Sequence, residues 1–200
     1  KNSKNADFLN NLGMFYSNIY DYKKAEEKYK KGLEIEKNNL SLLNNLANLK
    51  KDLDQTDEAV NIYERILSIK SDSLLVMYNL AGLYNSLGEF EKSKKLYFQM
   101  LEIKPDFTEA DRLISQMEKY DSKHKHFLNL KEKLSNMRLE DNSLLHLHFA
   151  LGKAHGDQKN YFESFDNYKK ANDISKKISN YSFEKSKRRF DAIKKKFRSL

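Results

Sequence analysis

Small and large apolar residues recur in this chain at two intervals, one set by the helical turn and one of 34 residues. Four columns share the longer interval: Leu12-Gly13, Leu46-Ala47 and Leu80-Ala81; Ala25, Ala59 and Ser93; Tyr29, Tyr63 and Tyr97; and Leu33, Leu67 and Leu101. Several columns with one period indicate an internal repeat, and a period of this length indicates two helices per unit. We therefore expect helices over residues 7–19, 22–36, 41–53, 56–70, 74–86 and 90–103.

The same internal spacing returns near the C-terminus, in Leu151-Gly152, Tyr161, Ser164, Tyr168 and Ala171. Between the two regions the pattern decays. Pro105 ends the third helix pair, and Asp106 with Glu109 predicts a capping arrangement for the next helix. Ile114-Ser115 keeps the position of the small residue, and a further helix is expected over 123–136.

These patterns predict a repeat domain over residues 1–180 and a basic amphipathic helix over 181–200. The repeat units are expected at about 6–39, 40–73, 74–107, a degenerate 108–142, and 143–178. On the last helix Phe183, Phe190, Ile193 and Phe197 share one narrow face. Because a terminal repeat needs a polar cover, we expect this stripe to pack on the fifth unit.

Small residues where two helices meet, and large tyrosines between units, suit helix pairs that bury their apolar faces by stacking. The expected fold class is all-α: an α-solenoid of stacked antiparallel helix pairs in a right-handed superhelix, with a C-terminal capping helix. The period and the columns resemble tetratricopeptide repeats. That resemblance covers the first three units and the fifth.

A narrower resemblance lies in the C-terminal third. Residues 148–154 (HFALGKA) are followed by Gln158 to Tyr161, Ser164-Phe165, Lys170 to Asn172, and a basic helix bearing Phe. This order resembles the end of the repeat domain of bacterial repeat-containing sulfotransferases, over about residues 106–198. The resemblance implies a catalytic domain after Leu200. No catalytic residue of that family can be carried over, because its phosphosulfate-binding loop has no counterpart here.

The net charge of +8 is confined to one segment. Residues 1–175 hold 27 basic and 27 acidic side chains, whereas residues 176–200 hold ten basic and two acidic ones. This basic tail could contact nucleic acid, an anionic membrane or an acidic protein, or be a solvated face. The 31 Lys against 6 Arg and the lack of an aromatic stacking module argue against nucleic acid. The candidate residues of the tail are Lys187, Arg188, Lys194, Lys195, Lys196 and Arg198.

Candidate chemistry is sparse. The chain has no Cys, no Gly-rich phosphate loop, and no His pair with the spacing of a helical zinc site. His148 occupies a core position and is expected to be a packed histidine. We therefore expect no catalytic residue, no metal and no cofactor.

No apolar run approaches the length of a transmembrane segment. We expect a cytoplasmic protein, and the first residue, Lys1, suggests a fragment.

The first helices of the units should form a concave wall. Asn11, Asn45 and Asn79 recur there at 34 residues and could form an asparagine ladder that binds a peptide backbone, or could hold neighbouring helices together. Both interpretations remain open. A carboxylate clamp is disfavoured, because Asn10 and Met14 stand where Lys and Asn would be needed. Further candidates for the wall are Asn10, Asn44, Asn48, Lys51, Tyr78, Asn85, Arg112 and Lys153.

The expected function is a non-catalytic scaffold that binds a protein or peptide in its groove. The sulfotransferase resemblance implies the N-terminal module of such an enzyme, used for substrate recognition or for self-association. The alternatives are a free-standing adaptor and a complete enzyme with an undetected activity. Continuation of the reading frame past Leu200 would distinguish them.

Overall fold

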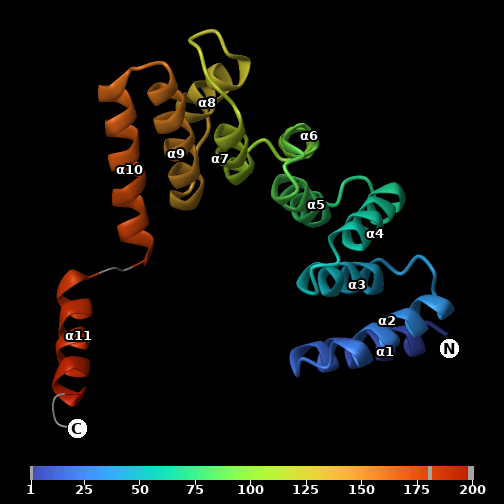
Figure 1. Cartoon of the computed structure of the whole chain (residues 1–200). Coiled ribbons are helices and arrows are strands. Elements are labelled where there is room, and N and C mark those ends of the chain that lie inside the picture. Colours follow the sequence, from blue (N-terminus) through green and yellow to red (C-terminus); the bar gives the residue numbers. More distant parts are fainter. Residues whose placement is uncertain (1, 180–181, 198–200) are drawn as a thin grey trace. The chain divides into compact units, whose positions relative to one another are not determined.

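The computed structural model describes residues 2–179 and 182–197, without the side chains of residues 2–4, 185 and 195–197. All regular structure in these ranges is helical (Figure 1). The chain divides into two compact units, Lys1–Ile103 and Lys104–Leu200. The helices are α1 (Asn2–Asn18), α2 (Tyr22–Ile35), α3 (Leu40–Asp52), α4 (Thr56–Ile69), α5 (Leu74–Ser86), α6 (Phe90–Ile103), α7 (Thr108–Met117), α8 (Lys125–Asn136), α9 (Asp141–Asp157), α10 (Tyr161–Ser179) and α11 (Phe183–Phe197).

The first unit consists of three helix pairs, α1 with α2, α3 with α4, and α5 with α6, and consecutive pairs stack through α2 on α3 and α4 on α5. This arrangement confirms the expected all-α repeat fold. Lys50 of α3 ties three helices together: its ammonium group lies 2.8 Å from Glu26 of α2 and 2.9 Å from Glu58 of α4. Lys50 is buried, so these partners offset its loss of hydration.

The columns of small residues mark close helix contacts. A Cβ atom on Gly13 would lie 2.4 Å from the Tyr29 ring. With a larger residue at position 13, α1 and α2 could therefore not lie as close together as they do. Ser93 and Ser164 serve the same contact with a hydroxyl group. Ser93 Oγ donates to the carbonyl of Ala81 at 2.8 Å, and Ser164 Oγ donates to that of Gly152 at 2.7 Å.

The turn inside each regular pair has one geometry. Tyr20, Asp54, Gly88 and Lys159 have φ between 59° and 77°, the left-handed region. The first three follow one another at the repeat interval. In each turn the next amide donates to a carbonyl five residues earlier, as Gln55 does to Lys50, which is the helix-ending Schellman arrangement. Glycine, the residue that this backbone conformation favours, is present at only one of the four positions, Gly88. The other three turns therefore could not be recognised from a glycine in the sequence.

The second unit departs from a regular stack. Helix α9 packs against α7, α8 and α10, so the degenerate fourth unit is organised around the first helix of the fifth. Its core includes Phe127, Leu130, Leu147 and Leu151. His148 is 8% exposed, and its Nδ1 lies 2.9 Å from Asn167 Oδ1, which confirms a packed histidine.

The expected cap of α7 is not formed. The helix begins at Thr108, so the residue at the N-cap position is Phe107, which makes no side-chain cap hydrogen bond. Asp106 stands one residue too early for its carboxylate to cap the first turn together with Glu109.

Helix α11 forms where a last helix is expected, but the expected cover over the fifth unit is not formed. Phe183, Phe190 and Ile193 are 69%, 65% and 47% exposed, and the side chain of Phe197 lies outside the described residues. The exposed residues of α10 include Lys169, Lys170, Lys176 and Lys177, which carry the same charge as α11, as well as the apolar side chains of Phe162 and Phe165, which are 82% and 70% exposed.

Candidate functional site

The residues predicted to line a groove fall in both units. In the first unit they lie on α1, α3 and α5, the first helix of each pair: Asn10, Asn11, Asn44, Asn45, Asn48, Lys51, Tyr78, Asn79 and Asn85. Arg112 on α7 and Lys153 on α9 belong to the second unit. The two sets are therefore described as two surfaces.

The three ladder positions differ in their contacts. Asn45 Nδ2 donates a hydrogen bond of 2.8 Å to Asn10 Oδ1, which connects α3 to α1. Asn79 hydrogen-bonds to the hydroxyl group of Tyr63. Asn11 is exposed on α1. Two of the three amides are thus engaged between helices of the first unit.

A buried tyrosine connects the wall to the core. Tyr63 is fully buried on α4, and its hydroxyl group donates to Asn48 Oδ1 at 2.6 Å. Burial, with a smaller contribution from the charge of Asp52, raises the pKa of Tyr63 to about 12. The hydroxyl group is therefore neutral and holds Asn48 in place. Asn44 Oδ1 is buried and has no hydrogen-bond partner among the described residues.

The wall formed by α5 borders a cavity of ≈ 410 Å³ in the first unit. Predicted groove residues line it together with the turn between α3 and α4. Tyr78 contacts the edge of Tyr97, with ring centroids 6.3 Å apart, and so presents a fixed ring at one side. The lining residues are Lys51, Asp54, Thr56, Tyr78, Asn79, Gly82, Leu83 and Ser86.

Gly82 keeps this cavity open. It lies at the repeat position occupied by Met14 in α1 and Asn48 in α3. A Cβ atom placed on it would meet no heavy atom within 4 Å, so close helix packing does not explain this glycine. Sequence reasoning missed it as a site residue. The sequence could have indicated it, because the repeat position that holds Met14 and Asn48 in the other two units of this region has no side chain at Gly82.

In the second unit the two predicted groove cations contact neighbouring side chains. The Arg112 guanidinium group lies 4.5 Å from the centre of the Phe149 ring. Lys153 donates to the carbonyl of Glu118, pairs with Asp157 at 2.5 Å, and lies over the Tyr120 ring. Both cations therefore hold helices of this unit together.

A buried charge cluster in the second unit was not expected. Asp111 of α7 is fully buried and accepts from Lys133 Nζ at 2.9 Å and 2.8 Å through its two oxygens. His126 Nε2 lies 3.1 Å from Asp111, and His126 Nδ1 lies 2.7 Å from the hydroxyl group of Tyr120. The signal was present in the sequence, because Asp111 falls in the repeat column of the buried residues Leu43 and Met77.

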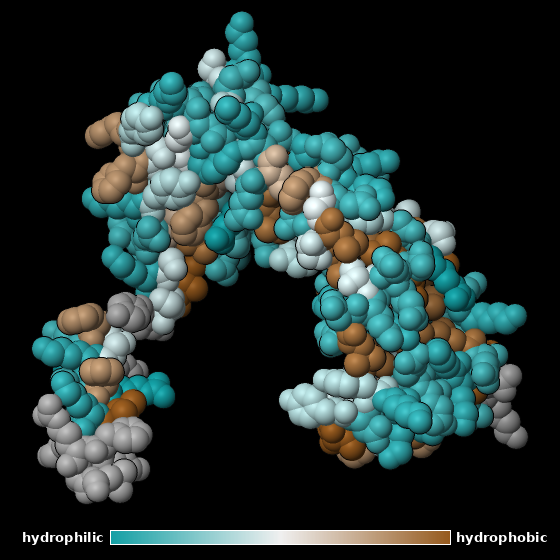
Figure 2. Space-filling model, in the orientation of Figure 1, coloured by the Kyte–Doolittle hydropathy of each residue, from teal (hydrophilic) through white to brown (hydrophobic). Residues whose placement is uncertain are grey.

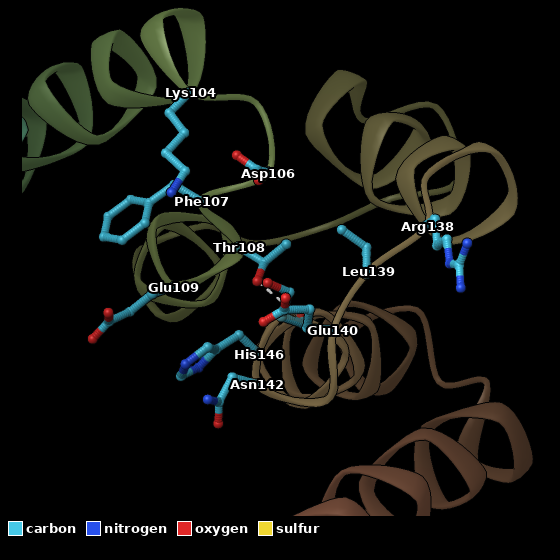
Figure 3. Close-up of a pocket in the computed structure, with 11 residues that line it drawn as sticks. Lys104, Asp106, Phe107, Thr108, Glu109, Arg138, Leu139, Glu140, Asn142 and His146 are labelled. Carbon is cyan, nitrogen blue, oxygen red and sulfur yellow. Dashed lines mark hydrogen bonds between the residues drawn. The ribbon is translucent and has the colours of Figure 1, made fainter.

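Near the start of α7 the second unit has a cavity of ≈ 420 Å³ (Figure 3). Thr108 Oγ1 donates to the carbonyl of Ser143 at its edge, at 2.9 Å. Burial lowers the pKa of His146, and its Nδ1 has no hydrogen-bond partner among the described residues. The other lining residues are Lys104, Asp106, Phe107, Glu109, Arg138, Leu139, Glu140 and Asn142, which mix both signs of charge and select no one ligand.

The basic tail is exposed where its side chains are described. Lys187, Arg188 and Lys194 are exposed, and Arg188 lies 3.6 Å from Glu184. The side chains of Lys195 and Lys196, and all of Arg198, lie outside the described residues.

Among the described residues there is no group of three or more His, Asp or Glu side chains placed to hold a metal ion. Likewise, no helix there has the length and apolarity required to cross a membrane.

Comparison with solved structures shows a shared fold. A MamA protein matches with a TM-score of 0.68 at 17% identity, over 90% of this chain and 97% of that one. A tetratricopeptide repeat protein from Parabacteroides merdae has a TM-score of 0.69 at 21% identity, over 88% of this chain and 68% of that one. The first repeat domain of Spaghetti, bound to an HSP90 peptide, has a TM-score of 0.53 at 23% identity, over 57% and 91%.

Sequence comparison identifies the repeat itself. No curated protein matches the sequence. Two models of the tetratricopeptide repeat match, one over residues 6–39 and the other over residues 52–117. The matched stretches together make up half of the chain, and the chain belongs to the tetratricopeptide-repeat family.

Proposed function

We propose that the wall formed by α1, α3 and α5 binds an extended segment of a partner protein, and that the cavity at Gly82 receives one of its side chains. The observation that carries this proposal is the open cavity beside Tyr78 and Lys51, on the helices that repeat proteins use as a binding surface. The Spaghetti domain, which has this fold, was solved with a bound peptide. The role is therefore that of a protein-binding scaffold.

The lining of the cavity indicates what it would accept. Tyr78 and Leu83 supply apolar surface, while Lys51, Asp54 and Asn79 supply polar groups at the rim. Binding pockets commonly combine an apolar lining with a few polar groups that fix orientation. The amides of Asn45 and Asn79 already bond within the unit. A partner side chain in the cavity would thus supply more selectivity than the ladder.

The test uses peptides selected from a random displayed library on the full chain. We expect Gly82→Phe to weaken the selected peptide at least about tenfold, because the new ring fills the cavity. Gly82→Ala is the matched control, since a methyl group leaves most of the volume free. Failure to select any peptide, or equal affinity of the Phe and Ala variants, would contradict the proposal.

A finer proposal concerns the parent protein. The order of residues from His148 to Asn172 supports a repeat module of a sulfotransferase, and an adaptor made of repeats alone agrees equally well with the fold. The gene distinguishes the two. A reading frame that continues past Leu200 into a Gly- and Ser/Thr-bearing phosphosulfate loop supports the enzyme module. A stop codon there supports the adaptor.

A further inference from the structure

The apolar stripe of α11 is exposed along its described length. Phe183, Phe190 and Ile193 fall at intervals of seven and three residues, which places them on one side of the helix. The exposed fractions of the three side chains are 69%, 65% and 47%, respectively. Figure 2 shows apolar and strongly hydrophilic side chains next to one another on the helix that Figure 1 labels α11. A stripe of large apolar residues on a charged helix needs an apolar partner.

The charges of α11 are sorted around this stripe. At about 100° per residue, Lys187 and Lys194 flank one edge of the stripe and Arg189 flanks the other, each within about 80° of its centre. Glu184 and Asp191 lie farther round, at about 120–140°. The helix as a whole holds seven basic and two acidic residues, a net charge of +5. Positive charge therefore borders both sides of the apolar line, and the acids face away from it.

The neighbouring surface of the chain matches this pattern only in part. The exposed residues of α10 include Phe162 and Phe165, which are 82% and 70% exposed, but also Lys169, Lys170, Lys176 and Lys177, so contact with α11 would bring like charges together. A surface that matches α11 offers apolar contact to the stripe and negative charge to the basic residues along both of its edges. The surface of an anionic lipid bilayer has this arrangement, with headgroup charge above acyl chains, and a flat surface meets both edges of the stripe at once.

We propose that α11 binds the surface of an anionic lipid bilayer, lying in its plane. The three apolar side chains enter the boundary of the acyl region, while Lys187, Lys194 and Arg189 extend their charged ends to the headgroups. With so narrow a stripe, neither the apolar contact nor the charge suffices alone, and binding is reversible. This inference is independent of the groove in the first unit.

The experiment is co-sedimentation of the full chain with vesicles of phosphatidylcholine alone, or with about one third phosphatidylserine. We expect at least about tenfold tighter binding to the anionic vesicles, and a loss of that advantage when salt rises well above 0.15 M. Phe190→Ser should reduce binding to the anionic vesicles by about tenfold. Circular dichroism checks that the repeats of each variant remain folded.

Charge reversal provides the matched pair. Lys194→Glu and Arg188→Glu change the net charge equally, but Lys194 borders the stripe and Arg188 lies on the opposite side beside Glu184. We expect Lys194→Glu to weaken vesicle binding more than Arg188→Glu. Equal loss in the two variants, or equal binding to both kinds of vesicle, would overturn the proposal. So would a dimer in the absence of lipid that Phe190→Ser dissociates, because a second copy would then cover the stripe.

Discussion

The side-chain amide of Asn45 donates a hydrogen bond to Asn10 Oδ1 at 2.8 Å, joining the first helices of two successive repeats. An asparagine that was a candidate for gripping a peptide backbone is thus bonded to the neighbouring unit. The two interpretations of the ladder, ligand binding and helix contact, now lead to different expectations for individual positions.

Asn45→Ala should lower the free energy of unfolding by about 0.5–1.5 kcal/mol, because it removes one net hydrogen bond between α1 and α3. Asn11→Ala is the matched control, since Asn11 holds the same repeat position but is exposed. Urea unfolding of both variants measures the difference. If Asn11→Ala instead weakens a selected peptide while leaving stability unchanged, the first ladder position serves binding.

Two glycines should respond oppositely to alanine. Gly13→Ala should lower stability, because the new Cβ would lie 2.4 Å from the Tyr29 ring, and overpacking costs about 1–3 kcal/mol. Gly82→Ala should raise stability by up to about 1 kcal/mol, because alanine favours the helix and the methyl group meets no neighbour. Thermal unfolding of the two variants tests this. A gain of stability in both would show that the helix contact at Gly13 tolerates a methyl group, and a loss in both would show that Gly82 has a neighbour that the methyl group meets.

The regular part of the fold was predictable because packing requirements repeat. Where Gly13, Ala25 and Tyr29 define the contact of a helix pair, the same residue types must return in each stacked unit, so periodicity located the helices. The helix expected over 56–70, for example, is observed at Thr56–Ile69. Turn geometry was less visible, because Tyr20, Asp54 and Lys159 adopt left-handed φ without glycine.

The site was less predictable than the fold. Repeat register placed Asn45, Asn48 and Asn79 on the first helices, but whether an amide contacts a ligand or a neighbour depends on side-chain geometry that register does not fix. The cavity at Gly82 arises from a side chain that is missing, which no motif records. On α11 the apolar stripe was recognised, but whether it packs on the fifth unit depends on side-chain contacts that periodicity does not fix.

Alkaline pH should destabilise the first unit through Tyr63. Its pKa is raised to about 12 by burial, whereas an exposed tyrosine titrates near 10. Between these values the unfolded chain loses its proton first, so the free energy of unfolding falls as pH rises from about 10 to 12. Tyr63→Phe cannot ionise, and its stability should fall less steeply over that window. Parallel slopes for wild type and variant would mean that other tyrosines with raised pKa values account for the loss.

The buried pair in the second unit makes the sharpest prediction about stability. Asp111→Leu leaves Lys133 buried without its carboxylate, and Lys133→Met leaves Asp111 with only His126. Each change should cost about 3–5 kcal/mol, because an unpaired buried charge keeps its desolvation penalty. The double variant should be more stable than either single one, because both charges leave together. Since the chain has two compact units, amide hydrogen exchange in α7, α8 and α9 is the suitable measurement. Losses that simply add in the double variant would show that Asp111 and Lys133 act separately and would contradict this prediction.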